Sequence, residues 1–111
     1  MYELKTQAEF DAAHFLTDYN GKCENLHGHN WHITVHCKAK TLNKDGMVVD
    51  FKHIKEKIHG YLDHGNLNEL LPFNPTAENI SKWIVDQIPE CWKAEVQESD
   101  GNVAVYVEDE A

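Results

Sequence analysis

Two segments in the first part of the chain alternate between apolar and polar residues, the pattern of a strand that buries one face. The apolar side of residues 2–14 is formed by Tyr2, Leu4, Ala8, Phe10 and Ala12. The apolar side of residues 27–40 is formed by His27, His29, Trp31, Ile33, Val35, Cys37 and Ala39. His14 falls in phase with the apolar side of its own segment. We therefore predict two long strands, joined by a loop at residues 16–26.

The second half of the chain changes to helical spacing and then returns to alternation. Asp50 and Thr76 suit helix N-caps, and Pro89 ends the second helix. The apolar positions that follow the first cap are Phe51, Ile54, Ile58, Tyr61 and Leu62. The residues on one side of the second helix are Ile80, Trp83, Ile84, Gln87 and Ile88. Alternation in residues 92–96 and 103–107, on both sides of a turn, predicts a β-hairpin.

The predicted order is strand–strand–helix–helix–strand–strand, or ββααββ, in a single domain that spans residues 1–111. The fold class that follows is α+β, with a four-stranded antiparallel sheet and two helices on one of its faces. A short sheet of this kind leaves the pairing groups of its two edges uncovered. We therefore expect the chain to assemble into a larger, closed sheet.

Composition narrows the range of partners. Ten lysines and no arginine stand against nineteen acidic residues, which gives a formal net charge of −9. A protein that binds nucleic acid needs a basic face, and this composition offers none. No apolar run approaches the ~20 residues that cross a membrane, and the N-terminus lacks the segments of a signal peptide. We expect a cytoplasmic protein whose three cysteines are thiols, without a nucleic-acid or membrane partner.

Three of the eight histidines, His14, His27 and His29, lie on the apolar faces of the first two predicted strands. Residues i and i+2 of a strand point to the same side, so His27 and His29 can bind one ion together with His14. Imidazole suits zinc, and three protein ligands leave a fourth position open, as in a catalytic site. The alternative is three unrelated structural histidines. The histidines that we expect at the surface are His32, His36, His53 and His59.

Other residues suit catalysis or ligand binding. Cys23 precedes the second strand, and a thiol near a divalent cation ionises more easily. Asp63 can orient His64 as a general acid or base. Glu98 ends the apolar side of a strand, where a carboxylate can accept two hydrogen bonds from an amidine-like group. Each residue also has a structural alternative. Cys23 can be a small loop residue, Asp63 and His64 can be chain neighbours that do not bond to each other, and Glu98 can be a solvated glutamate at a strand end.

Taken together, these residues resemble the 6-pyruvoyltetrahydropterin synthase / 6-carboxytetrahydropterin synthase family over nearly the whole chain. The matching motifs are 10–14 (FDAAH), 23–29 (CENLHGH), 46–51 (GMVVDF), 62–64 (LDH), 67–68 (LN), 74–79 (NPTAEN) and 96–99 (VQES). The resemblance implies the tunnelling fold, in which ββααββ subunits form barrel-shaped trimers and two trimers form a homohexamer. It also implies active sites that lie between subunits.

The resemblance also assigns roles to individual residues. His14, His27 and His29 match the family's zinc ligands. Cys23 matches the catalytic thiol, and Asp63 with His64 matches the proton-relay pair. The residues that match contacts to the pterin substrate are Glu98, which anchors the ring, and Thr76.

The spacing Cys-x3-His-Gly-His resembles the 6-carboxytetrahydropterin synthase branch of 7-deazaguanine (queuosine) biosynthesis. It implies a zinc-dependent lyase that converts 7,8-dihydroneopterin triphosphate to 6-carboxy-5,6,7,8-tetrahydropterin, acetaldehyde and triphosphate. The missing arginines leave recognition of the triphosphate to lysines, backbone amides or histidines.

Glu24 opens a second possibility, because Glu-x2-His-Gly-His is the signature of a branch that cleaves the dihydroneopterin side chain towards folate. The product would then be 6-hydroxymethyl-7,8-dihydropterin, made through Glu24 alone or beside the first activity. The 6-pyruvoyltetrahydropterin synthase reaction is a further alternative. An interpretation from another class is a non-catalytic module that binds a metal or a pterin.

Overall fold

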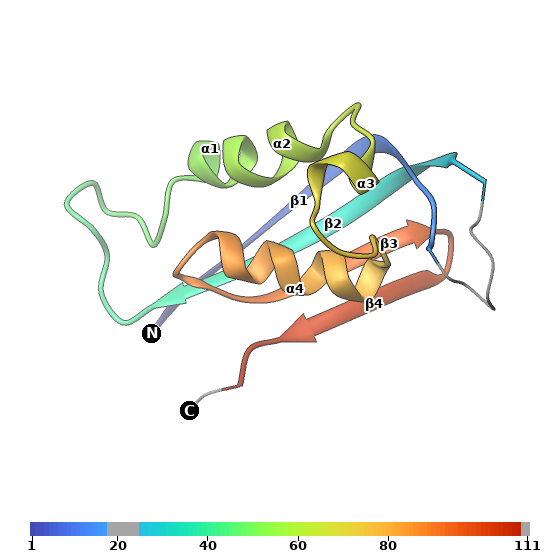
Figure 1. The fold of residues 1–111 in the computed structure, drawn as a ribbon. Coiled ribbons are helices and arrows are strands. Elements are labelled where there is room, and N and C mark those ends of the chain that lie inside the picture. The colour runs from blue at the N-terminus through green and yellow to red at the C-terminus, as the bar shows by residue number, and fades with distance from the viewer. Residues whose placement is uncertain (18–24, 110–111) are drawn as a thin grey trace.

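The computed structural model describes residues 1–17 and 25–109, which form one antiparallel sheet with helices on one of its faces (Figure 1). The four strands follow one another in the sheet in chain order: β1 (Tyr2–His14), β2 (His27–Ala39), β3 (Cys91–Ser99) and β4 (Asn102–Val107). The helical segments are α1 (Phe51–Ile54), η1 (Lys55–His59), α2 (Gly60–Leu62), α3 (Leu67–Leu70) and α4 (Ala77–Gln87). The predicted α+β class and strand order are confirmed.

The first predicted helix is present over residues 51–62, although its middle turn, η1, has π-helical hydrogen bonding. The side chain of Asp50 caps it by accepting a hydrogen bond of 2.9 Å from the N–H of Lys52. Ile54 and Ile58, one turn apart, are buried against the sheet. The expected apolar side therefore meets the core at Ile54, Ile58 and Leu62, but Phe51 and Tyr61, which were also expected on it, are exposed.

The second predicted helix is α4, and its expected cap is also confirmed. The hydroxyl of Thr76 accepts a hydrogen bond of 3.1 Å from the N–H of Asn79. Ile80 and Ile84 are fully buried where α4 packs on β3 and β4. The short helix α3 was not predicted, because its four residues are too few to produce a periodic pattern.

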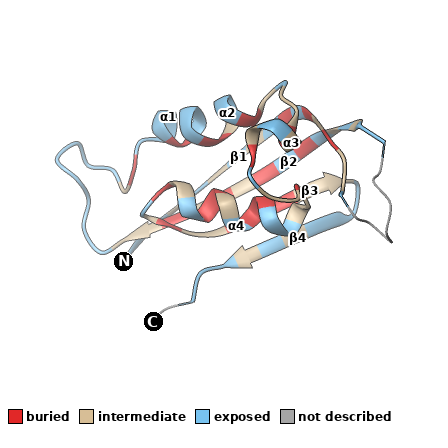
Figure 2. Cartoon of the chain, viewed as in Figure 1, coloured by how far each residue is buried: buried red, intermediate tan, exposed pale blue. Residues whose placement is uncertain are grey.

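The core lies between the helices and the sheet, as the buried positions in Figure 2 show. Phe10 and Trp31 lie opposite each other on β1 and β2, and their rings stack with centroids 6.1 Å apart. Both belong to the alternating apolar faces identified from the sequence. The opposite face of the sheet carries the polar positions of the same strands, as a period of two requires.

Two of the four histidines expected at the surface are in fact half-buried. His36 lies on the polar face of β2, where its Nε2 is 2.7 Å from Oε2 of Glu95 on β3. His59 bonds through Nε2 to the carbonyl of Glu9 at 2.7 Å. That expectation was wrong for these two residues, because each imidazole has a bonding partner on the sheet. His32 and His53 are exposed, as expected.

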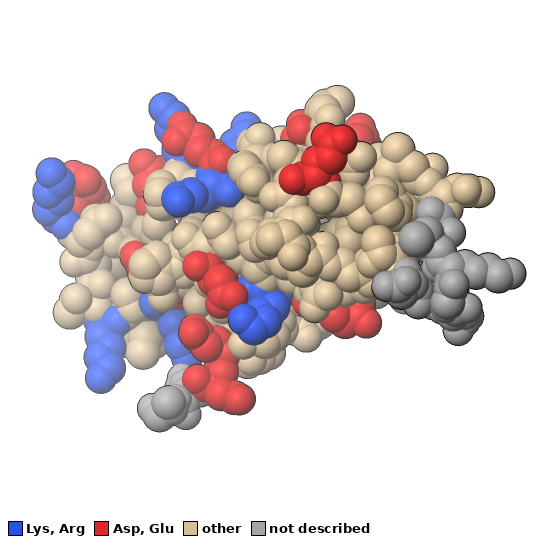
Figure 3. Space-filling model, viewed as in Figure 1, with Lys and Arg blue, Asp and Glu red and all other residues tan. Residues whose placement is uncertain are grey.

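Charged side chains of both signs are interspersed on the surface in Figure 3, and the lysines do not gather into one patch there. In the part of the chain that the structure describes, no helix is long and apolar enough to span a membrane.

Candidate metal centre

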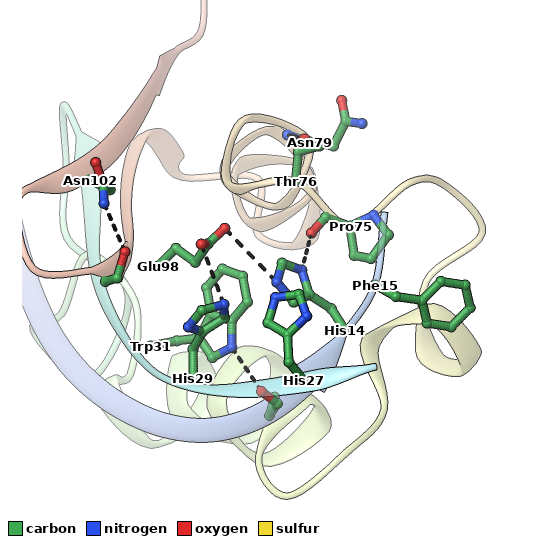
Figure 4. Close-up of polar contacts among 12 residues, drawn as sticks. His14, Phe15, His27, His29, Trp31, Pro75, Thr76, Asn79, Glu98 and Asn102 are labelled. Carbon is green, nitrogen blue, oxygen red and sulfur yellow. Dashed lines mark hydrogen bonds and ion pairs between the residues drawn. The ribbon is translucent and has the colours of Figure 1, made fainter. Parts of the chain in front are cut away.

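The antiparallel pairing of β1 with β2 brings three histidines together at one end of the sheet. His14 lies directly opposite His27, and His29 lies opposite Ala12, one step along the same face. The ring centroids of the three imidazoles are 4.6, 4.8 and 5.1 Å apart. Each ring offers one nitrogen to a group in which all such atoms lie within 4.8 Å of one another (Figure 4). The cluster predicted from the alternating pattern is therefore present.

Main-chain carbonyl groups orient two of these rings. Nδ1 of His14 bonds to the carbonyl of Pro75 at 2.9 Å, and Nδ1 of His27 bonds to the carbonyl of Asn25 at 2.8 Å. A carbonyl only accepts, so Nδ1 is the donor in both rings and Nε2 is the nitrogen left to bind a metal. This arrangement is typical of metal-ligating histidines, whose second nitrogen donates to a protein acceptor.

The environment of His14 fits a metal ligand. Its side chain is 1% exposed, and Nε2 has no hydrogen-bond partner among the residues that the structure describes. A buried polar atom without a hydrogen bond costs free energy unless another interaction replaces the bond. A metal ion held by His14, His27 and His29 would supply that interaction. Among the described residues, these three side chains form a group that could hold zinc.

The segment after His14 is fixed by one asparagine. Oδ1 of Asn68 accepts a hydrogen bond of 2.8 Å from the N–H of Phe15, and Nδ2 donates one of 2.9 Å to the Phe15 carbonyl. On the other side of the cluster, the ring of Trp31 lies edge-on to His14 and His29, with centroids 5.0 and 5.6 Å away. The histidines are thus held by a packed and hydrogen-bonded frame.

Glu98 on β3 reaches the same cluster. Its Oε1 is 3.3 Å from Nε2 of His29, and its Oε2 is 3.9 Å from Nε2 of His14. The side chain is 31% exposed, so the carboxylate borders both the histidines and the solvent. The sequence placed Glu98 in phase with Ala94 and Val96, and its side chain does lie on their side of the sheet, facing the cluster (Figure 4).

Asp63 and His64 lie at the outer edge of β1. Nδ1 of His64 is 3.0 Å from Oδ2 of Asp63, so the two predicted partners are bonded to each other. The other oxygen of Asp63 accepts a hydrogen bond of 3.2 Å from the N–H of Asp11, and the N–H of His64 donates one of 2.6 Å to the Asp11 carbonyl. Within the described residues, neither side chain bonds to the three histidines. His64 is 79% exposed and has a positive φ of 60°.

The Asp63 carboxyl has a shifted pKa. Loss of water around it would raise the pKa, but the hydrogen bond from Asp11 and the contact with His64 outweigh this effect. The pKa of Asp63 is therefore below its ordinary value, and the group is a carboxylate at neutral pH. An ionised carboxylate 3.0 Å from Nδ1 fixes the tautomer of His64 and the orientation of its ring.

Of the three remaining predicted site residues, the structure describes Thr76 but not Cys23 or Glu24. Thr76 follows Pro75, whose carbonyl orients His14, and its hydroxyl caps α4. Cys23 and Glu24 lie outside the described residues, so their predicted roles stay predictions. Pro75 and Asn68 were not predicted as parts of the site. The sequence signal that could have indicated them is their position within the matching motifs 74–79 and 67–68.

Comparison with known proteins finds a matching family and relatives that are named for pterin enzymes. A sequence profile of the family described as "6-pyruvoyl tetrahydropterin synthase" matches residues 3–109. A 6-carboxy-5,6,7,8-tetrahydropterin synthase from Synechocystis sp. is 34% identical over 99 residues, which cover 81% of this chain and 77% of the relative. A dihydroneopterin monophosphate aldolase from Pyrococcus furiosus is 40% identical over 85 residues, which cover 74% of this chain and 70% of the relative.

A solved structure gives the same fold. The 6-pyruvoyl tetrahydropterin synthase of Caenorhabditis elegans superposes with a TM-score of 0.75 at 23% identity, over 97% of this chain and 96% of that chain.

Proposed function

The chain belongs to the 6-pyruvoyl tetrahydropterin synthase family, and on that premise we propose that it is a zinc-dependent lyase acting on a pterin. The proposed reaction converts 7,8-dihydroneopterin triphosphate and water to 6-carboxy-5,6,7,8-tetrahydropterin, acetaldehyde and triphosphate. The observation that carries the proposal is the histidine cluster, in which the buried Nε2 of His14 lacks a hydrogen-bond partner among the described residues. Relatives named for this product support the choice of reaction.

The roles of the chain's own residues follow from their chemistry. His14, His27 and His29 hold the zinc, which when bound supplies Lewis-acid activation of the substrate's side-chain hydroxyls. Glu98 accepts hydrogen bonds from the amino-pyrimidinone edge of the pterin, a planar group with two adjacent donors.

We assign proton transfer to His64, Asp63 and Cys23. His64, oriented by Asp63, exchanges protons with the substrate, and Cys23 acts as a thiolate base on a carbon-bound proton. Thr76 contacts the pterin from the start of α4.

The position of His64 supports a site completed by a second copy of the chain. Its ring is 79% exposed, and within the described residues no bond joins it to the histidine cluster of its own chain. The outer edge of β1 before Glu9 makes no main-chain hydrogen bond in the described residues. Alternate valines along β4, the other edge strand, are about half exposed: Val103, Val105 and Val107. We propose a homohexamer of two trimers, joined through these edges, in which His64 serves a neighbouring cluster.

The test is to incubate the purified, zinc-loaded protein with 7,8-dihydroneopterin triphosphate and identify the pterins by mass spectrometry. We expect 6-carboxy-5,6,7,8-tetrahydropterin from the wild type and none from His27→Ala, which should also lose most of its zinc. A wild type that binds zinc and pterin but forms no product would overturn the enzymatic proposal in favour of a binding module.

The name of one relative and the position of Glu24 favour a second reaction, cleavage of the dihydroneopterin side chain. The relative from Pyrococcus furiosus is named a dihydroneopterin monophosphate aldolase, and Glu24 stands three residues before His27. We propose that Glu24 supports release of 6-hydroxymethyl-7,8-dihydropterin as a side activity. Glu24→Ala should then abolish this product and keep the carboxylated one, whereas Cys23→Ala should do the reverse. If the wild type makes no hydroxymethyl product, the second activity is absent.

A further inference from the structure

The carboxylate of Glu98 is shared between two histidines of the metal cluster. Oε1 is 3.3 Å from Nε2 of His29, and Oε2 is 3.9 Å from Nε2 of His14 (Figure 4). The His14 nitrogen is the one left without a hydrogen bond after Nδ1 has bonded to Pro75. A glutamate that only anchored a pterin would have no need to approach these atoms.

The separation from His29 has the right size for neighbouring ligands of one ion, whereas the 3.9 Å between Oε2 and Nε2 of His14 would have to shorten when the ion binds. Zinc binds imidazole nitrogen and carboxylate oxygen at about 2.0–2.2 Å, so two ligands of a tetrahedral ion lie about 3.3–3.5 Å apart. The distance from Oε1 of Glu98 to Nε2 of His29 is 3.3 Å. A carboxylate also supplies a negative charge beside three neutral imidazoles, which lowers the cost of holding a divalent cation next to the buried His14.

A local irregularity of the sheet aims Glu98 at the cluster. The register of β3 with β4 shifts between Gln97, which pairs with Val103, and Ser99, which pairs with Asn102. Glu98 therefore lies in a β-bulge, a feature that re-aims a side chain relative to a regular strand. Its partial exposure leaves one side of the carboxylate open to the solvent, from which a substrate would arrive.

Resting on the proposed function, we propose that Glu98 is the fourth ligand of the metal in the substrate-free protein. When a pterin binds, its amino-pyrimidinone edge would compete for the carboxylate of Glu98, which would then accept the two hydrogen bonds of that edge instead of binding the metal. No electron or covalent transfer is involved, because one ligand is exchanged for another.

The chain offers a matched control on the same strand. Glu95 also pairs with a histidine, His36, at 2.7 Å, but on the opposite face of the sheet. Glu98→Gln and Glu95→Gln therefore make the same chemical change, one at the cluster and one away from it. Glu98→Ala serves as a second variant at the cluster, and the urea midpoint of each variant establishes that it is folded.

The experiment measures zinc affinity by competition with a chromophoric chelator and the visible absorption of the cobalt-substituted protein. Glu98→Gln and Glu98→Ala should bind zinc about 10–100-fold more weakly than the wild type, the range found when a partner of a metal site is removed. Glu95→Gln should stay within twofold. Without any pterin, the cobalt spectrum of Glu98→Gln should already differ from those of the wild type and Glu95→Gln, because this variant lacks the carboxylate ligand of the substrate-free protein.

Two results would separate this inference from the proposed function. If both Glu98 variants bind zinc as tightly as Glu95→Gln but bind neopterin more weakly, Glu98 is a pterin anchor alone and the inference fails, while the proposed lyase stands. If the wild type binds no zinc at stoichiometric concentration, the proposed metal site fails, and this inference fails with it.

Discussion

Replacing Asn68 with alanine tests whether the frame around the metal cluster is as important as the ligands. The side chain of Asn68 makes two hydrogen bonds to the backbone of Phe15, the residue directly after His14. A hydrogen bond contributes about 0.5–1.5 kcal/mol net, so the loss of two lowers the free energy of unfolding by about 1–3 kcal/mol. With a urea m value of ~1–3 kcal/mol/M, the midpoint should fall by about 1 M.

The effect should extend to metal binding, because the chain that carries His14 loses its anchor. We expect Asn68→Ala to weaken zinc binding about 10-fold, within the range for partners that orient a metal ligand. Urea unfolding of the metal-free protein, followed by tryptophan fluorescence, measures stability, and chelator competition measures zinc affinity. The control is Asn102→Ala, which removes one exposed hydrogen bond of 2.8 Å to Ser99 at the hairpin turn. Equal midpoints and equal zinc affinities for the two variants would refute the reasoning.

Three further predictions concern stability and reactivity. Cys37 and Cys91 are both fully buried, so peptide mass spectrometry should find both cysteines unalkylated by iodoacetamide until denaturant is added; labelling in the folded protein would contradict this. The hydrogen bond between the two thiols raises the pKa of Cys37 and lowers the pKa of Cys91, so any labelling through local opening should reach Cys91 first. Because the pKa of Asp63 is lowered in the folded state, its contribution to stability is complete at neutral pH and is lost as the pH falls below about 4. The difference in urea midpoint between the wild type and Asp63→Asn should therefore be present at pH 6 and shrink at pH 3, and a constant difference would argue against the bonded carboxylate. A Cβ added at Gly65 would overlap the side chain of Leu70, so Gly65→Ala should cost about 1–3 kcal/mol in urea unfolding, and an unchanged midpoint would mean that Leu70 moves freely.

The strands and the histidine cluster could be predicted from the sequence because a period of two leaves few alternatives. A slip of one residue would move every apolar side chain of β1 or β2 to the wrong face, so the pattern that buries Phe10 and Trp31 also fixes His14 opposite His27. The caps Asp50 and Thr76 were predictable for a similar reason, since short polar side chains before an apolar helical pattern have a well-defined bonding role.

The orientation of the histidine rings could not be predicted in this way. Their partners are the carbonyl groups of Pro75 and Asn25, and a main-chain carbonyl has no residue type that marks it in a sequence. The position of Pro75 beside His14 depends on the path of the loop before α4, a tertiary contact between residues 61 positions apart. The phase of Glu98 with Ala94 and Val96 predicted the face of the sheet on which it lies, but the one-residue shift of register beside it was not predicted.

The placement of Asp63 and His64 explains why one chain carries only part of the proposed site. The segment 63–66 bonds to the edge of β1 at Asp11 and Ala13, which seals that edge next to the metal cluster and keeps His14 at the end of a regular strand. The backbone of His64, at a φ of 60°, is bonded to the sheet, while its side chain is 79% exposed. The structure therefore brings the three histidines together within one sheet, whereas Asp63 and His64 lie at its outer edge and make no bond to the cluster among the described residues. In the homohexamer that we propose, the His64 of a neighbouring copy would complete the site.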